Sequence, residues 1–255
     1  MTTDVTMIQL LKAELFKIRK NKSLYVMLFG QMILFMLSAL SLMNDFSELG
    51  GSTTLSSKFL ETTYTTSSIV ILSYFSFFQI ILFCSSICDT EHRNNGYKQL
   101  FVLPVCRGKI FFSKQILYLS ILVVAWLVYI ASYYLGALII AAYNNYPVSE
   151  IISSQLPPFF LKVFVGILPL FALQYFLSLY FKKYIVPIAI GIFGFGFTFV
   201  AIAAQWKIEP YNPYGLSLYY VIVHFRSAFF GSIVPDMSRI YNAIIEFIAF
   251  TGVSY

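Results

Sequence analysis

The residues of this chain that could do chemistry are most densely gathered in one charged stretch between two apolar runs. Residues 88–115 read CDTEHRNNGYKQLFVLPVCRGKIFFSKQ. The stretch holds two carboxylates and five basic side chains, namely Asp89, Glu91, Arg93, Lys98, Arg107, Lys109 and Lys114. Charged groups held in a loop suit the recognition of a complementary partner surface. The stretch therefore indicates an interaction element rather than a catalytic centre.

The motifs of common catalytic and nucleotide-binding sites are missing from the sequence. It has no GxxxxGK[ST] phosphate loop, no HExxH and no GxSxG. Cys84, Cys88 and His92 are spaced four residues apart and imitate a metal site on one helix face. Small side chains packed at a helix end explain them more simply. We therefore expect no enzyme activity, no cofactor and no metal in this chain.

One carboxylate falls inside an apolar stretch near the end of the sequence. Placing Glu246 in a bilayer without a partner costs at least ~2.5 kcal/mol. Its candidate partners are Arg239, about two helical turns earlier, and Gln174 in another apolar stretch. Glu246 and Gln174 thus form a candidate intramembrane polar site. Structural pairing and protonation fit it equally well, and protonation makes a proton-coupled secondary transporter an alternative function.

The composition indicates a membrane protein. The 255 residues are 59% hydrophobic and 11% charged, with a mean hydropathy of +0.78, whereas a soluble domain carries about 25% charged residues. The net charge of +6 does not indicate a nucleic-acid partner, because the basic residues lie at the ends of apolar stretches. The predicted fold class is therefore an all-α membrane protein.

The apolar stretches predict about six transmembrane helices. A helix needs about 20 apolar residues to cross the hydrocarbon layer. Five stretches meet this requirement, at 24–43, 67–88, 115–143, 163–181 and 184–204. A sixth and weaker one covers about 236–255. We expect residues 24–255 to form a single six-span domain, preceded by a separate interfacial element at 1–23.

The basic residues predict the orientation of these spans. Twelve of the 17 Lys and Arg residues fall before the first span, in the 88–115 stretch or between the fourth and fifth spans. The positive-inside rule places these segments and the N-terminus in the cytoplasm. Residues 205–235 are apolar but interrupted by prolines, so we expect re-entrant or interfacial helices before the last span. If 214–234 crossed instead, the C-terminus would lie outside.

The N-terminal segment predicts an amphipathic helix on the membrane lipid. Four apolar residues share one helical face, with charged residues at its borders; the four are Ile8, Leu11, Leu15 and Ile18. Such a helix lies in the plane of the cytoplasmic membrane surface. The alternative is an ordinary charged flank that fixes the topology.

The centre of the charged stretch predicts a short docking helix. The turn residues at 94–96 can end the second span. Residues 97–103 can form two helical turns with Leu100 and Leu103 on one face, and Pro104 stops them. Two membrane spans would hold this helix at the cytoplasmic surface, where a soluble partner domain can push on it.

The order of residues in this stretch resembles the loop after the second span in permeases of type-2 ABC exporters. The matching positions are Glu91, Gly96, Leu100, Leu103, Pro104, Val105, Arg107, Ile110 and Lys114. Three more segments are similar to the family, namely LLKAELFKIRKNKSLYVML, LSLYFKKYIVPIAIGI and EPYNPYGL. The resemblance covers most of the chain and is closest to the bacteriocin (lantibiotic) immunity and multidrug export group.

The resemblance implies a function without catalysis in this chain. A permease of this family pairs with an identical or paralogous permease and binds two cytoplasmic ABC ATPase subunits, which use ATP and Mg²⁺. It exports an amphipathic substrate, such as an antimicrobial peptide, a drug or a lipid-like molecule, across the bacterial cell membrane. The resemblance assigns ATPase coupling to Glu91, Gly96, Tyr97, Leu100, Leu103, Pro104 and Arg107.

The sequence departs from the family pattern at two of these loop positions. Tyr97 stands where a small Thr usually follows the glycine, and Cys106 replaces a usual Ser. No family motif marks a substrate site. Two further functions stay open, which are clearing antimicrobial peptide from the membrane without a translocation path and serving as a non-transport membrane scaffold.

Overall fold

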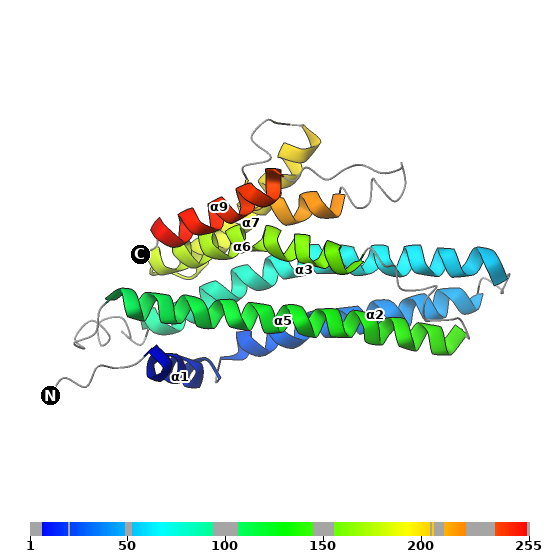
Figure 1. The fold of residues 1–255 in the computed structure, drawn as a ribbon, viewed down its shortest axis with the longest axis horizontal. Coiled ribbons are helices and arrows are strands. Elements are labelled where there is room, and N and C mark those ends of the chain that lie inside the picture. Colours follow the sequence, from blue (N-terminus) through cyan, green and yellow to red (C-terminus); the bar gives the residue numbers. More distant parts are fainter. Residues whose placement is uncertain are drawn as a thin grey trace.

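The computed structural model of the chain is a bundle of helices, most of which run along one long axis (Figure 1). The structure describes residues 7–19, 21–48, 53–93, 107–144, 156–204, 206, 212–222 and 238–253. Regular structure in these ranges is helical throughout, without a strand. The predicted all-α fold class is therefore confirmed.

Within the described residues, four helices are long and apolar enough to cross a membrane. The apolar stretches are Thr63–Arg93, Gly108–Tyr143, Pro157–Tyr180 and Ile185–Ile202, and Lys22–Leu37 is a shorter apolar helix. The labelled helices are α1 (Met7–Ile18), α2 (Lys22–Glu48), α3 (Thr53–Arg93), α5 (Arg107–Asn144), α6 (Leu156–Tyr180), α7 (Ile185–Ala203) and α9 (Ser238–Val253). A chain with these helices is suited to cross a membrane several times, and the six-span count stays a prediction.

The helix α3 begins well before the apolar run that predicted it. We expected the second span to start at Ser67, but α3 starts at Thr53. One residue ahead of the run, Tyr64, has a partner on α5, because its hydroxyl donates to the carbonyl of Tyr133 at 2.7 Å. Within α3, Ser68 Oγ donates to the carbonyl of Tyr64 at 2.5 Å. Composition therefore did not predict that the helix begins before the expected span, and the boundaries of the span in the membrane stay a prediction.

An aromatic cluster holds α2, α3 and α5 together. The ring of Phe35 lies 5.5 Å from that of Tyr64 and 5.7 Å from that of Tyr129, both in T-shaped contact. The hydroxyl of Tyr129 donates to the carbonyl of Ser68 at 3.0 Å. Such aromatic pairs contribute about 0.5–1.5 kcal/mol each beyond the area they bury. Gly136 leaves the room that this packing needs, since a Cβ there would lie 2.4 Å from the Tyr64 hydroxyl.

The segment 212–222 is buried against α6 and α7. Two hydrogen bonds of Asn212 fix the start of this segment. Its Nδ2 donates to Thr198 Oγ1 of α7 at 3.0 Å, and its Oδ1 accepts from the amide of Tyr214 at 3.1 Å. Residues 216–222 then form a short helix, and its backbone at Ser217 touches α6 at Gly166. This helix lies within the segment predicted to be re-entrant or interfacial, and that prediction stays open; residues 223–237 lie outside the described part.

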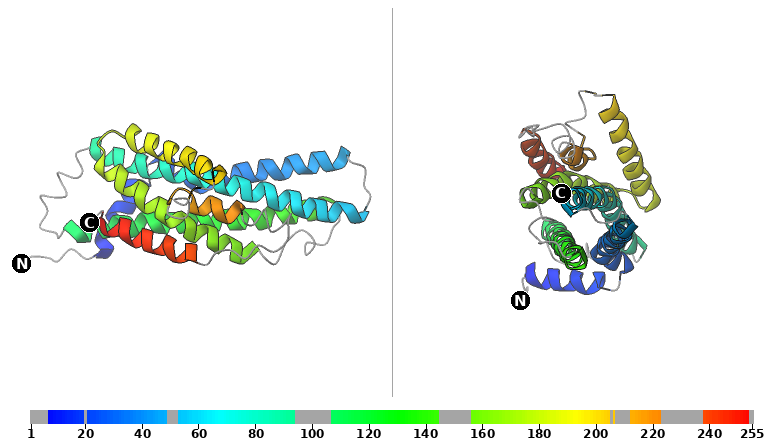
Figure 2. Two further views of the ribbon diagram at one scale, coloured as in Figure 1. Left: turned by 90° about the horizontal axis from the view of Figure 1, so that it is seen from above. Right: turned by 90° about the vertical axis from the view of Figure 1, so that its right-hand side faces the viewer.

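Both termini lie toward one end of the bundle, which we call the N-terminal end (Figure 1). The helix α1 lies at this end and contacts α5. Figure 2 shows α1 lengthwise in the view where α5 is nearly end-on, so α1 runs across the bundle axis. An orientation of this kind is the one expected of a helix lying in a membrane surface.

The tight contact at Gly166 gives a first prediction. A Cβ added there would lie 3.1 Å from both Cα and N of Ser217, which are backbone atoms and yield little. We expect Gly166→Ala to destabilise the protein by about 1–3 kcal/mol through overpacking. The measurement is the thermal unfolding midpoint of the purified protein in detergent.

The matched control is Gly196→Ala on α7, where a Cβ meets no described atom within 4 Å. Alanine is favoured over glycine in a helix by up to ~1 kcal/mol, so this variant should unfold at the same temperature or higher. Equal losses of stability in the two variants would show that 212–222 does not pack on α6 in this way.

Candidate functional site

Three buried charged side chains meet at the N-terminal end of the bundle. Lys114 of α5 donates a hydrogen bond from Nζ to Oε1 of Glu91, near the end of α3, and its Nζ lies 3.6 Å from Oε1 of Glu14 on α1. The side chains are only 3%, 9% and 6% exposed. Lys17 lies 3.1 Å from Glu14 and is 52% exposed. We call Glu14, Lys17, Glu91 and Lys114 the ion cluster.

The charges of the ion cluster balance only when all four members are counted. The three buried groups carry one positive and two negative charges, and Lys17 supplies the second positive charge from the surface. Removing one partner of a buried pair costs roughly 3–5 kcal/mol, because the remaining charge stays desolvated and unpaired. The half-exposed contact of Lys17 contributes at most about 1 kcal/mol. Lys114 is therefore the member on which the arrangement depends.

The sequence of α1 explains how Glu14 reaches Lys114. Leu11, Glu14 and Ile18 share a helical face at spacings of three and four residues, and this face is turned inward, with Glu14 and Ile18 buried. Leu15 belongs to the apolar face predicted from the sequence but is 50% exposed. The side chain of Ile8 lies outside the described residues. The packed side of α1 thus includes a carboxylate.

The ion cluster surrounds the entrance and exit of the predicted coupling segment. Glu91 lies about one helical turn before residues 94–106, and Lys114 lies about two turns after them. Of the residues assigned to ATPase coupling, the structure places Glu91 in the ion cluster and Arg107 at the start of α5. The others, Gly96, Tyr97, Leu100, Leu103 and Pro104, lie outside the described residues.

Further polar contacts tie neighbouring helices to the same end. Gln115, next to Lys114, donates from Nε2 to Thr251 Oγ1 of α9 at 2.8 Å. Ser23, at the start of α2, donates to Ser86 Oγ of α3 at 2.7 Å. The N-terminal end of α5 is therefore bonded to α1, α3 and α9, and a displacement of it is shared among these helices.

The second candidate site is not assembled as one unit. Gln174 of α6 donates from Nε2 to the carbonyl of Pro187 in α7 at 2.9 Å. Glu246 of α9 is half-buried, and among the described residues no ion pair involves it and its Oε2 has no hydrogen-bond partner. The guanidinium carbon of Arg239 instead lies 3.4 Å from the centroid of the Tyr219 ring, on helix 216–222. This cation–π contact joins α9 to segment 212–222.

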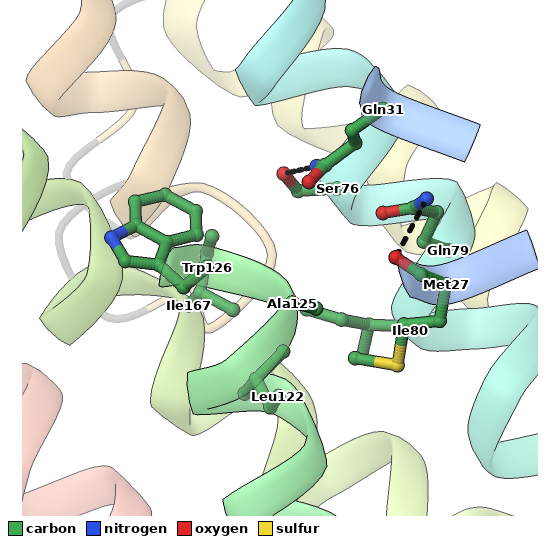
Figure 3. Close-up of a pocket in the computed structure, with 9 residues that line it drawn as sticks. All are labelled: Met27, Gln31, Ser76, Gln79, Ile80, Leu122, Ala125, Trp126 and Ile167. Atoms are coloured by element: carbon green, nitrogen blue, oxygen red, sulfur yellow. Dashed lines mark hydrogen bonds between the residues drawn. The ribbon is translucent and has the colours of Figure 1, made fainter. Parts of the chain in front are cut away.

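A small and mostly apolar cavity, with three polar side chains at its wall, lies between α2, α3, α5 and α6 (Figure 3). Gln31 donates from Nε2 to Ser76 Oγ, and Gln79 donates to the carbonyls of Val26 and Met27 at 2.9 and 3.3 Å. The cavity measures about 10 Å³, close to the least space that one water molecule needs. It has no room for a substrate, and its hydrogen bonds fix α2 on α3. Its lining residues are Met27, Gln31, Ser76, Gln79, Ile80, Leu122, Ala125, Trp126 and Ile167.

Sequence reasoning found Glu91 and missed Glu14 and the role of Lys114. The available signal was that Glu14 is the only acidic residue between Met7 and Met43, in a segment rich in Lys and Arg. A carboxylate that stands alone among basic residues and shares a helical face with apolar residues indicates a side chain that is paired with a basic group. The identity of its partner required the packing of α1 on α5.

The ion cluster predicts a large difference between two lysines of α5. We expect Lys114→Met to lower the free energy of unfolding by about 3–5 kcal/mol, because Glu14 and Glu91 lose their buried counter-ion. Lys109→Met, at an exposed position of the same helix, should change it by less than about 0.5 kcal/mol. Unfolding in denaturant, followed in detergent, measures both. Equal stability of the two variants would contradict the buried pairing.

Comparison with known proteins identifies the family of the chain. No curated protein sequence and no solved structure matched the chain. One family model matched residues 10–198, and its description is ABC-2 family transporter protein. The match covers more than half of the chain and includes the ion cluster. It also includes three of the four candidate membrane spans in full and the fourth up to its last turn. The chain therefore belongs to the ABC-2 transporter family and is a multi-pass membrane permease.

Proposed function

We propose that this chain is the permease subunit of an ATP-driven exporter whose energy comes from separate cytoplasmic ATPase subunits. The observation that carries the proposal is the ion cluster. Through the buried Lys114, it joins α3, which precedes segment 94–106, α5, which follows this segment, and α1. A force applied to that segment therefore reaches three helices together.

The three helices move together because separating their buried charges costs free energy. Pulling Lys114 away from Glu91 and Glu14 in a low-dielectric environment leaves uncompensated charge and costs several kcal/mol. Bending or tilting the helices as a group avoids that cost. The hydrogen bonds of Gln79 to the carbonyls of Val26 and Met27 add α2 to the group. Motion at the N-terminal end is then transmitted along α2, α3 and α5 to the aromatic cluster.

The partners and the location follow from the family resemblance and the charge distribution. We propose two copies of a cytoplasmic ABC ATPase that bind ATP and Mg²⁺, with segment 94–106 as the coupling element. A second permease, identical or paralogous, completes the transporter. The chain would cross the bacterial cell membrane six times, with α9 as the last span and both termini in the cytoplasm. The shared position of the termini supports this topology (Figure 1).

The substrate class proposed is an amphipathic molecule, such as an antimicrobial peptide, a drug or a lipid-like compound. The resemblance to the bacteriocin immunity and multidrug export group supports it. A proton-coupled transporter that uses Glu246 is the second candidate, favoured by the Glu246 Oε2 atom that lacks a hydrogen-bond partner among the described residues. Transport that persists without any ATPase and is abolished by Glu246→Gln would favour this second candidate over the exporter.

The first test is capture of the ATPase. We expect the chain, solubilised in mild detergent, to retain a soluble ATPase encoded beside it. Arg107→Glu should reduce the captured ATPase about tenfold or more, because a reversed charge at the exit of segment 94–106 repels the docking surface. Lys182→Glu, exposed in the α6–α7 turn, is the matched control and should retain capture. Absence of an ATPase from the unaltered complex would overturn the exporter proposal.

The second test separates docking from transmission. Glu14→Gln removes the α1 carboxylate but leaves the bond between Lys114 and Glu91. We expect ATPase capture to be unchanged and ATP-driven export to fall roughly 5–150-fold, the range of a typical coupling energy. Ala13→Gln, at an exposed position of α1, should leave both unchanged. Full export by Glu14→Gln would show that α1 takes no part in coupling.

A further inference from the structure

The exposed charged side chains of α1 and of the first turn of α2 are basic among the described residues. Lys12, Arg19 and Lys22 are exposed there, and we call these three residues the basic elbow. The one acidic residue in the sequence from Met7 to Met43 is Glu14, and it is buried in the ion cluster. Burial of Glu14 therefore leaves only basic residues among the exposed charged side chains described in this stretch.

Large apolar side chains are exposed beside the basic elbow. Phe16 and Leu15 of α1 are 67% and 50% exposed, and Tyr25 of α2 is 51% exposed. Exposed apolar residues continue along α2 at helical spacing as Phe29, Ile33, Leu37 and Leu40. Bulky apolar and basic side chains together are typical of helices that lie at the boundary between headgroups and acyl chains. The apolar part therefore indicates a lipid surface rather than water around the elbow.

The elbow is held in a fixed shape by hydrogen bonds. Asn21 Oδ1 accepts the amide of Ser23 at 3.0 Å and so caps α2. Ser23 Oγ donates to Ser86 of α3 at 2.7 Å, and the Tyr25 hydroxyl donates to the carbonyl of Arg19 at 3.2 Å. A rigid backbone loses little further entropy when its side chains bind a ligand. Arg19 and Lys22 are thus held on the two sides of a fixed turn, and Lys12, on α1, lies about two helical turns before Arg19.

We propose that the basic elbow binds the phosphate groups of anionic phospholipids in the cytoplasmic leaflet. The inference rests on the proposed orientation of the permease, which places α1 at that leaflet. A basic residue near an anionic membrane surface strengthens association by roughly fivefold. Because α1 is bonded to α5 through Glu14 and Lys114, lipid bound at the elbow also holds the ion cluster at the membrane surface.

The test measures which lipid lies beside α1. A fluorescent reporter is introduced by Phe16→Trp in the full chain, and the unaltered chain, with Trp126 and Trp206, supplies the background. The protein is placed in phosphatidylcholine vesicles that contain a small equal share of brominated phosphatidylglycerol or of brominated phosphatidylcholine. Bromine quenches the reporter on contact. We expect the anionic lipid to associate at least roughly fivefold more strongly than the neutral one.

Charge variants show whether the elbow is responsible. Lys12→Gln, Arg19→Gln and Lys22→Gln combined should bring the two lipids to equal quenching. The matched control is Lys182→Gln with Lys183→Gln, which removes two exposed basic residues elsewhere on the predicted cytoplasmic side and should keep the preference. Raising the salt concentration to about 1 M shortens the screening length to about 3 Å and should weaken the preference in the unaltered elbow.

Three outcomes would contradict the proposal. The first is equal quenching by both lipids in the unaltered elbow, and the second is a preference that survives in the combined variant. The third is loss of ATPase capture in that variant with its lipid preference intact, which would assign the elbow to the ATPase. The vesicles contain no ATPase, so the lipid result stands or fails independently of the exporter proposal.

Discussion

The buried contact of Lys114 with Glu91 and Glu14 is the constraint on which the N-terminal end of this permease depends. Two carboxylates from different helices are stable in a nearly dry environment only because one ammonium group lies within reach of both. The price of that arrangement is that none of the three helices can leave alone. The helices α1, α3 and α5 are therefore joined at the end where segment 94–106 departs from α3 and returns to α5.

Away from this end the bundle is held by a different kind of interaction. Aromatic rings of α2, α3 and α5 pack edge to face around Phe35, and buried hydroxyls donate to backbone carbonyls. Glycines at α6 and α7 let segment 212–222 approach closely. These contacts fix the geometry of the packed helices, but they include no charged side chain. In the proposed mechanism the charged end transmits position, while the aromatic and glycine contacts keep the helices in register.

Much of the architecture could be predicted from the sequence, and the remainder depended on contacts between helices. Apolar length predicted the apolar part of α3, and the described helix extends beyond the expected span at both ends, from Thr53 to Arg93; the turn signal at 94–96 lies outside the described residues. Composition did not predict the earlier start of α3, where Tyr64 donates a hydrogen bond to α5. Sequence reasoning also missed Glu14, because helical periodicity identifies a face but not the residue opposite it. Glu91 was found through its place in the loop, and its partner Lys114 needed the fold.

The central claim is that α1 and α5 move as one body when the ATPase acts on segment 94–106. The most direct measurement places spin labels at Ala13 of α1 and Lys109 of α5, both exposed, after replacement of the native cysteines. Electron–electron distances are then recorded for the ATPase-bound permease with and without ATP and Mg²⁺. The account predicts an unchanged distance for this pair, together with a changed distance from Lys109 to Phe193 on α7. A shift between Ala13 and Lys109 upon addition of ATP would contradict it.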